Sequence, residues 1–240
     1  LRITDLAPIG EGKIWIGTID GAYLYDEVRQ EGDYFGTRNR LAHNNIYDLF
    51  LDQNKIINIA THTNRVAQFI DDEIVDVIVS DTGEIPNINY IMQDEDGAMW
   101  YGTDGMGLYQ VEGNPPEHTI ITTEQGMVSN YCYQVVVDRF SNVWTTHRNG
   151  FSRYIPRTGT AIPYLNKENF GFISNEVYTA MLDRKGNIWF GTAKGIIRYN
   201  WVPTRTRVVA PYIQIEGLEV MNEYRRASGA LELPYDEYLI

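Results

Sequence analysis

The sequence predicts an all-β protein built from about five small, similar sheets. Two observations lead to this expectation: a motif that recurs at a nearly constant spacing, and short β-branched and aromatic runs separated by turn-forming residues. The motif is clearest in DRKGNIWFGTAKGIIRYN, residues 183–200, and in GEGKIWIGTIDGAYLYD, residues 10–26. Each copy contains a turn, a tryptophan, a Gly-Thr pair and a second turn.

The tryptophan marks the repeat, and a degenerate copy carries Asn58 in its place. The five markers are Trp15, Asn58, Trp100, Trp144 and Trp189, spaced 43, 42, 44 and 45 residues apart. Asp stands six residues before the marker in four copies, and Thr stands three residues after it in four. The exceptions are Ile9 in the Asp position and His147 in the Thr position. An apolar residue stands twelve before the marker in all five copies.

Each repeat accommodates four short strands. NNIYDLFLD and IWFGT read as the first two, GIIRYN as a third, and DEIVDVIVS as a fourth. Four strands in about 42 residues are typical of a β-propeller blade. We therefore predict a propeller segment spanning 1–203, with repeats at about 1–40, 41–84, 85–126, 127–170 and 171–203. We expect it to be part of a larger propeller with further blades before Leu1, and its fifth blade to lack the outer strand.

The repeated residues have structural interpretations. Trp15, Trp100, Trp144 and Trp189 are predicted to fill the space between neighbouring blades. The Asp-x-x-Gly runs are interpreted as hairpin turns, because a calcium loop needs more ligands and a closing Glu. Cys132 falls in the apolar strand position and is predicted to be a buried, inert thiol.

Composition and motifs exclude several kinds of activity. The net charge of −12 argues against a nucleic-acid partner. The four histidines form neither His-x-His nor His-Glu-x-x-His, and no Gly-x-Ser-x-Gly motif occurs. We therefore expect no catalytic residues, no metal and no cofactor, and we expect this segment not to be an enzyme. No apolar run approaches the roughly 18 residues of a membrane span.

The string Asp-x-x-Gly-x-x-Trp-x-Gly-Thr-x-x-Gly-x-x-x-Tyr resembles the two-component regulator propeller repeat, over five repeats. MVSNYCYQVVVD and FISNEVYTAMLD resemble the strand that leads into that family's repeat. The pattern stops after Asn200, and a linker is predicted at 204–210. Residues 211–240, with APYIQIEGLEVMNE and LELPYDEYLI, resemble the first strands of the YYY (triple-tyrosine) domain, an immunoglobulin-like β-sandwich.

In this family, a propeller followed by a YYY domain implies the sensor half of a membrane-bound, often hybrid, two-component histidine kinase. The resemblance implies a periplasmic ectodomain of an inner-membrane protein, an oligosaccharide ligand, and control of glycan-utilisation genes. It also implies a homodimer in the full-length protein, with the membrane contacted only through downstream segments. The alternatives are a protein-interaction scaffold and, less favoured, a propeller lyase. Aromatic and amide side chains suit both sugars and protein partners.

Chain direction predicts where a ligand binds. The loops that enter the innermost strands, and the loops that follow the repeated Thr, should share one face of the blades. The candidate ligand-binding residues are His43, Asn45, His62, Arg65, Asp104, Tyr133, His147 and Arg148. The same face should carry Asn44, Asn64, Asn87, Asn130, Asn149 and Asn175, and further aromatic and amide candidates at the blade tips are Tyr47, Asn89, Tyr131 and Tyr178.

Overall fold

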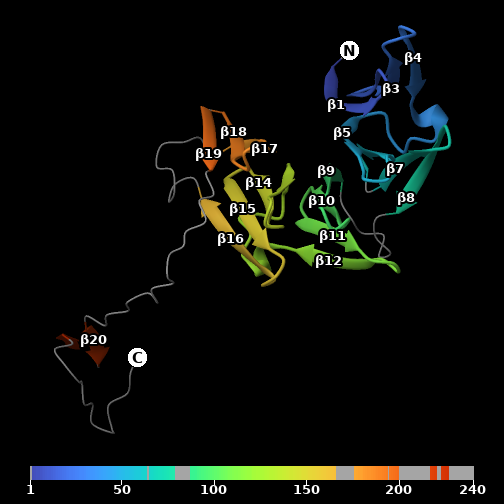
Figure 1. Ribbon diagram of the computed structural model, residues 1–240. Coiled ribbons are helices and arrows are strands. Elements are labelled where there is room, and N and C mark those ends of the chain that lie inside the picture. Colours follow the sequence, from blue (N-terminus) through green and yellow to red (C-terminus); the bar gives the residue numbers. More distant parts are fainter. Residues whose placement is uncertain are drawn as a thin grey trace. The chain divides into compact units, whose positions relative to one another are not determined.

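The computed structural model describes residues 2–63, 65–78, 87–165, 176–193 and 195–199, and the backbone of 217–220 and 223–226. The chain divides into two units, Leu1–Trp201 and Val202–Ile240. The first unit contains five antiparallel sheets, one after another along the chain (Figure 1). The prediction of an all-β segment of five blades is confirmed.

Within each blade the strands pair in chain order. The first blade has β1 (Ile3–Gly10), β2 (Lys13–Thr18), β3 (Gly21–Asp26) and β4 (Glu31–Phe35). The second has β5 (Ile46–Leu51), β6 (Ile57–Thr61), β7 (Arg65–Ile70) and β8 (Glu73–Ile78). The third has β9 (Ile88–Gln93), β10 (Met99–Thr103), β11 (Leu108–Glu112) and β12 (Glu117–Ile121). The fourth has β13 (Val135–Val137), β14 (Val143–His147), β15 (Gly150–Ile155) and β16 (Thr160–Leu165). The described part of the fifth has β17 (Val177–Leu182), β18 (Ile188–Thr192) and β19 (Gly195–Tyr199).

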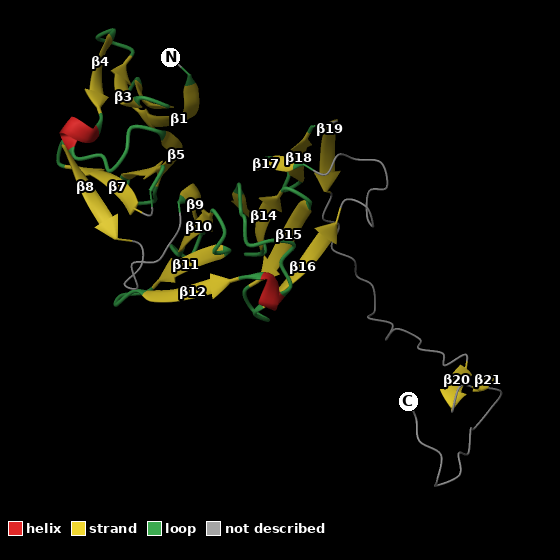
Figure 2. Ribbon diagram, turned by 180° about the vertical axis from the view of Figure 1, so that it is seen from behind, coloured by secondary structure: helices red, strands yellow, loops and turns green. Residues whose placement is uncertain are grey.

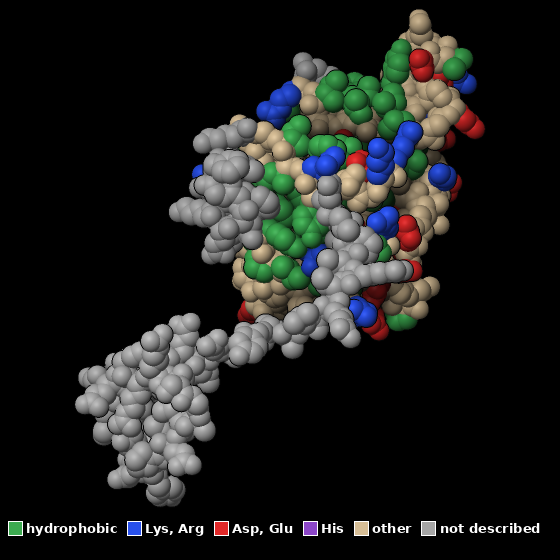
Figure 3. Space-filling view, turned by 60° about the vertical axis from the view of Figure 1, so that its left-hand side comes forward, with side chains coloured by type: hydrophobic (Ala, Val, Ile, Leu, Met, Phe, Trp, Pro, Cys, Tyr) green, Lys and Arg blue, Asp and Glu red, His purple; other side chains and the backbone are tan. Residues whose placement is uncertain are grey.

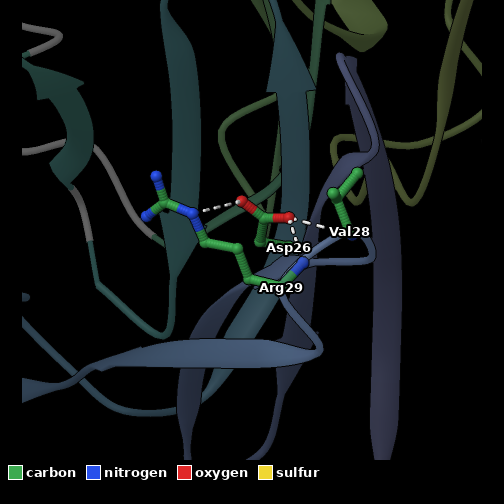
Figure 4. A network of polar contacts seen from close by, with 3 residues as sticks. All are labelled: Asp26, Val28 and Arg29. Carbon is green, nitrogen blue, oxygen red and sulfur yellow. Dashed lines mark hydrogen bonds and ion pairs between the residues drawn. The ribbon is translucent and has the colours of Figure 1, made fainter.

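Short side chains that accept hydrogen bonds from the backbone close the turns. At the turn between β3 and β4, the Asp26 carboxylate accepts hydrogen bonds of 3.0 Å from the backbone N–H groups of Val28 and Arg29 (Figure 4). The same carboxylate also forms an ion pair with Nε of Arg29 at 3.7 Å. Such local bonding is the reason that Asp is favoured at turns.

Two 3-10 helical turns, η1 (Thr37–Asn39) and η2 (Thr123–Gln125), precede the second and fourth blades and are red in Figure 2. Asn44 accepts a hydrogen bond of 2.8 Å from the N–H of Thr37, and Asn130 accepts one of 2.9 Å from the N–H of Thr123. Both asparagines thus hold the loop that delivers the chain to the next blade.

Among the described residues, four apolar cores are present, and each lies between neighbouring blades. Trp15 packs at a ring-centroid distance of 5.0 Å on Phe69 of the second blade. Trp100 lies 6.0 Å from Tyr154 of the fourth blade. Trp144 lies 4.7 Å from Tyr199 of the fifth. The interpretation of these three tryptophans as fillers between blades is therefore confirmed.

The second blade lacks the tryptophan, and other side chains fill its boundary with the third blade. Asn58, which takes its place, is buried, and its Oδ1 accepts a 2.8 Å hydrogen bond from Nε2 of Gln68. Between the second and third blades, Tyr101 and Tyr109 supply the aromatic surface, with Phe50 packed against them. The boundary between the second and third blades is thus filled by apolar and aromatic side chains of both blades, without a tryptophan.

The innermost strands β1, β5, β9, β13 and β17 each contact the next along the series. Side chains ten residues before the repeat marker join them. Asp5 Oδ2 accepts a 2.8 Å hydrogen bond from the N–H of Leu49, one blade on. Asp48 Oδ2 accepts one of 2.7 Å from Ile91, and Gln134 Oε1 one of 2.8 Å from Ala180. These bonds connect the first blade to the second, the second to the third, and the fourth to the fifth.

The first and fifth blades each have an exposed apolar side. Leu6 is 50% exposed, whereas the matching Leu49, Ile91, Val135 and Ala180 are buried. In the fifth blade Ile196 is 72% exposed, whereas the matching Phe151 of the fourth is buried. Figure 3 shows one face of the molecule, on which apolar side chains form broad patches beside Lys and Arg. Within the described residues, these two sides have no neighbouring blade.

The second unit is described only through a two-stranded antiparallel hairpin, β20 (Gly217–Val220) and β21 (Glu223–Arg226). The predicted linker at 204–210 and most of the predicted immunoglobulin-like domain lie outside the described residues. The predicted absence of an outer strand in the fifth blade concerns residues that are also outside them. Among the described residues, no helix has the length and apolar character needed to cross a membrane.

Candidate ligand-binding face

Loops that enter the innermost strands and loops that follow the second strands lie at the same end of the blades. Backbone hydrogen bonds join them directly, from Gly21 N–H to the Asn44 carbonyl at 2.7 Å and from Asp104 N–H to the Asn87 carbonyl at 2.9 Å. The predicted sharing of one face by these loops follows from this bonding. We call this end the tyrosine face, after Tyr47, Tyr133 and Tyr178, which lie near the start of the innermost strands. The opposite end, with the Asp-initiated turns, is the hairpin face.

The three tyrosines occupy one position of the repeat, eleven residues before the marker. Thr4 and Asn89 hold that position in the first and third blades. Because the blades repeat the same geometry, this position places a ring at the rim of three of the five innermost strands. The tyrosine face therefore carries aromatic side chains at equivalent positions of three blades.

The first group of side chains on this face is centred on Tyr47. Its hydroxyl lies 2.7 Å from Nδ1 of His62, and the His62 ring lies 5.6 Å from that of His43. The His43 Nδ1 accepts a 3.0 Å hydrogen bond from the N–H of Asn45, which fixes the orientation of its ring. Partial burial, and then the carboxylate of Asp104 on the third blade, raise the pKa of Tyr47. Four predicted residues, His43, Asn45, His62 and Asp104, are thus gathered around one tyrosine.

The second group joins the fourth and fifth blades. The rings of Tyr133 and Tyr178 lie 5.5 Å apart at a tilt of 51°, and Tyr178 is 49% exposed. Nε of Arg148 forms an ion pair with Glu176 at 4.0 Å, and the Arg148 side chain is largely exposed. Desolvation, and then the neighbouring Glu176, raise the pKa of Tyr178. An open aromatic pair therefore stands beside one cation and one carboxylate.

Tyr131 lies between these groups. It is 52% exposed, and its backbone pairs with Asp104 in an isolated bridge. Its ring lies against Gly105, where an added Cβ would be 3.4 Å from the ring. Gly105 has φ of +108°, a conformation that residues with a side chain rarely adopt. The glycine thus allows the loop to pass close to the tyrosine.

Of the predicted ligand residues, His147 is wrongly placed by the sequence argument. Its side chain is fully buried, with Nδ1 2.8 Å from the carbonyl of Tyr131 and Nε2 2.8 Å from Oγ of Ser152. Burial lowers the pKa of His147 to about 4, so the ring is neutral near pH 7. Both nitrogens are used inside the blade, and we remove this residue from the site.

Other predicted residues divide between surface and scaffold. Arg65 begins β7 and is exposed, and Asn149 lies in the exposed turn after β14. Asn44 and Asn130 use their side chains to hold η1 and η2, as described above, and Asn89 donates a 3.0 Å hydrogen bond to the carbonyl of Cys132. Asn64 and Asn175 lie outside the described residues.

Groups suited to covalent or metal chemistry are not assembled in the described part of the chain. No cluster of three or more His, Cys, Asp or Glu side chains that could hold a metal ion is found there. Cys132 is fully buried, and burial raises the pKa of its thiol to about 12, which keeps it protonated. The prediction of a buried thiol is confirmed. What the face offers is aromatic surface and hydrogen-bonding groups.

Sequence reasoning identified the loops that share the tyrosine face, but it did not identify the repeat position that orders the tyrosines on it. The repeated Tyr position was visible in the spacing of Tyr47, Tyr133 and Tyr178 from their markers, and it was missed as a pattern. The position next to it, with Asp5, Asp48 and Gln134, was missed as well. A polar residue recurring in an otherwise apolar strand was the available signal.

The comparisons with known proteins identify the repeat and the fold. The family described as "Two component regulator propeller" matches residues 171–194, which contain the marker Trp189. A comparison with curated protein sequences gives no significant match.

Solved structures match over most of the chain. The extracellular domain of BT3049 from B. thetaiotaomicron, assigned to the hybrid two component systems, is 22% identical with a TM-score of 0.72, covering 82% of this chain and 27% of that one. That of BT4673 from the same organism, assigned likewise, is 19% identical with a TM-score of 0.70, covering 83% and 27%. Virginiamycin B lyase from Staphylococcus aureus is 11% identical with a TM-score of 0.63, covering 85% and 71%. The chain thus spans about a quarter of the length of these two extracellular domains, and these similarities show that it has the β-propeller fold.

Proposed function

We propose that this chain is a ligand-sensing segment of the extracytoplasmic part of a two-component sensor, and that its tyrosine face binds a neutral oligosaccharide. The observation that carries the proposal is the pair Tyr133–Tyr178, with rings 5.5 Å apart and Tyr178 half exposed beside Arg148 and Glu176. The family match at 171–194, which includes Tyr178, supports the assignment to sensing.

The chemistry of the face suits a sugar. Sugar rings present C–H groups on one side, which pack on aromatic faces, and hydroxyl groups at their edges, which need hydrogen-bond partners. Tyr178 supplies an aromatic surface, and the guanidinium of Arg148 and the carboxylate of Glu176 supply a donor and an acceptor next to it. Tyr47, His62 and Asp104 repeat this combination between the second and third blades. An oligosaccharide that follows the innermost strands could occupy both groups.

The larger context is part of the same proposal. The segment belongs to the periplasmic ectodomain of an inner-membrane histidine kinase that dimerises and controls glycan-utilisation genes. Further blades of the parent protein cover the apolar sides marked by Leu6 and Ile196, as neighbours cover the equivalent positions elsewhere. The segment itself has no turnover. A change in ligand occupancy acts by the difference in affinity between two arrangements of the parent protein.

A titration of the purified chain against neutral oligosaccharides tests the proposal, with binding followed by calorimetry. Tyr178→Ala should weaken binding of the selected sugar by roughly tenfold, because it removes the exposed ring of the pair. Tyr34→Ala is a matched control. Tyr34 is 41% exposed, packs against Tyr23 at 5.1 Å, and lies on the outer strand β4 of the first blade.

Equal loss of binding in both variants would indicate a general effect on the fold. Failure of every neutral oligosaccharide to bind, with the chain folded, would overturn the sugar assignment and favour a protein partner for the same face.

A further inference from the structure

A cavity of about 440 Å³ lies on the hairpin face of the fourth blade, at the opposite end from the tyrosines. Its wall is formed by the turn between β13 and β14, the end of β15, and the turn that follows β15. The residues that line it are Phe140, Ser141, Asn142, Arg153, Ile155, Pro156 and Arg157. Its volume is within the range of about 300–1,000 Å³ that is usual for sites of small ligands.

Arg153 lines this cavity and carries one side-chain N–H without a hydrogen-bond partner. Its guanidinium lies 5.4 Å from the Trp144 ring, so the side chain is held in place by packing. Its Nε is buried and has no hydrogen-bond partner. A buried donor of a charged group without a partner is unfavourable, and the guanidinium that carries it belongs to a residue that lines the cavity.

The side chains that line the cavity include two arginines, Arg153 and Arg157, and no carboxylate. The nearest acidic residue of the same blade is Asp138, in the turn that forms part of the wall. Asp138 is 7% exposed, and its carboxylate already accepts hydrogen bonds from Phe140, Asn142 and Trp144. These bonds hold the Asp138 carboxylate in the turn, while Arg157 adds a second cation to the cavity wall.

The repeat provides an internal comparison. Arg198 holds the same position in the fifth blade and lies 5.6 Å from the Trp189 ring. Stacking on the tryptophan therefore belongs to the repeat and does not require a ligand. Arg198 is exposed, however, whereas Arg153 lines the cavity and combines the same stacking with a buried, unpartnered Nε.

We propose that this cavity is a second binding site, for a small organic carboxylate. The carboxylate would accept hydrogen bonds from Arg153, with Arg157 adding a second positive charge, because guanidinium groups match carboxylate geometry. The body of the ligand would pack against Phe140, Ile155 and Pro156, which favours an organic anion over an inorganic one. The site is independent of the proposed sugar site, since it shares no residue with it.

Calorimetric titration of the whole chain at low ionic strength tests this inference. The probes are glucuronate and benzoate, with glucose as the neutral counterpart of the first and inorganic sulfate as an anion without an organic body. We expect one or both carboxylates to bind, and glucose and sulfate to bind at least tenfold more weakly. Binding of glucuronate but not benzoate would indicate that the ligand is a sugar acid. Binding of benzoate but not glucuronate would indicate an aromatic acid.

Variants locate the binding. Arg153→Gln should weaken carboxylate binding by roughly tenfold or more, and Arg157→Gln, in an exposed turn, by a smaller factor. The matched control Arg198→Gln, which loses the same stacking on a tryptophan, should leave affinity unchanged, as should Tyr178→Ala at the sugar site. Arg157→Gln keeps the test decisive if Arg153→Gln does not fold.

The proposal is overturned if neither carboxylate binds, or if sulfate binds as tightly as both. It is also overturned if carboxylate affinity is the same in both cavity variants as in the unchanged chain.

Discussion

Nε1 of Trp144 donates a hydrogen bond of 2.9 Å to Oδ2 of Asp138, six residues earlier in the chain. The same bond joins Trp100 to Asp94 at 2.8 Å and Trp189 to Asp183 at 2.9 Å. The repeated Asp therefore has two functions. It closes the hairpin turn through the backbone, and it satisfies the one polar atom of the ring that fills the space between blades.

The first blade shows what happens when this aspartate is absent. Ile9 occupies the Asp position, and Nε1 of Trp15 is buried without a hydrogen-bond partner. We predict that Trp144→Phe lowers the free energy of unfolding by about 1–3 kcal/mol more than Trp15→Phe does. Each change removes a similar volume, but only the first removes a hydrogen bond and leaves a carboxylate oxygen short of a donor. Urea denaturation of the two variants measures the difference, and equal losses would contradict the argument.

The sequence predicted the five blades because the repeat is a property of spacing alone. The tryptophans, the turns and the inner position of β1 all follow from one period. Contacts between blades were harder to predict, because Asp5 and Leu49 meet only when two repeats are placed side by side. The hydrogen bonds and the pKa of a residue such as Asp48 depend on the blades on both sides of it. Spacing within a single repeat does not show which residues those blades place beside it.

His147 shows why one site residue was misassigned. His147 differs from the Thr of the other repeats, and this difference was interpreted as a sign that packing does not determine the residue there. In the structure His147 is buried and has a hydrogen-bonding partner inside the blade. Ser152 bonds to it, and the strand register places Ser152 where the other blades have Tyr23, Ala67, Tyr109 and Ile197. The paired appearance of two unusual residues in one blade was the signal that would have identified an internal contact.

The buried His147 should make the protein sensitive to acid. Burial lowers its pKa to about 4 in the folded state, from an ordinary value of 6.5. Between these values the unfolded chain binds a proton that the folded chain does not, so stability is lost as the pH falls from 6.5 toward 4. Because one pKa unit corresponds to about 1.4 kcal/mol, the loss from this residue is about 3 kcal/mol.

We predict that His147→Thr, which restores the residue of the other blades, reduces this loss. Denaturant unfolding of both proteins at intervals from pH 7 to pH 4 measures it. The slope with pH is the readout, so a constant loss of stability from the smaller side chain does not affect the conclusion. A variant with the same slope as the unchanged chain would contradict the assignment.

Asp48 should change the stability with pH in the opposite direction from His147. Its side chain is buried, and burial, with the neighbouring Asp5 on β1, raises its pKa well above 3.8, although the N–H of Ile91 hydrogen-bonds to it. Tyr90 on β9 also faces this group, and burial, with Asp48 itself, raises the pKa of Tyr90 to about 12. Between pH 3.8 and the raised pKa, Asp48 is therefore protonated in the folded state and ionised in the unfolded chain. The resulting stability is fully present below pH 3.8 and is lost as the pH rises through the raised value.

We predict that Asp48→Asn removes this decline with rising pH, because an amide oxygen can accept the same hydrogen bond from Ile91 and does not ionise. The measurement is the unfolding free energy from pH 4 to pH 8, made also in the His147→Thr background, where the opposing effect of the histidine is absent. Asp26→Asn is the control, since hydrogen bonding lowers the pKa of that partly buried turn aspartate and its removal should leave the decline in place. If Asp48→Asn retained the full decline with pH, the connection between the second and third blades would not depend on a protonated Asp48.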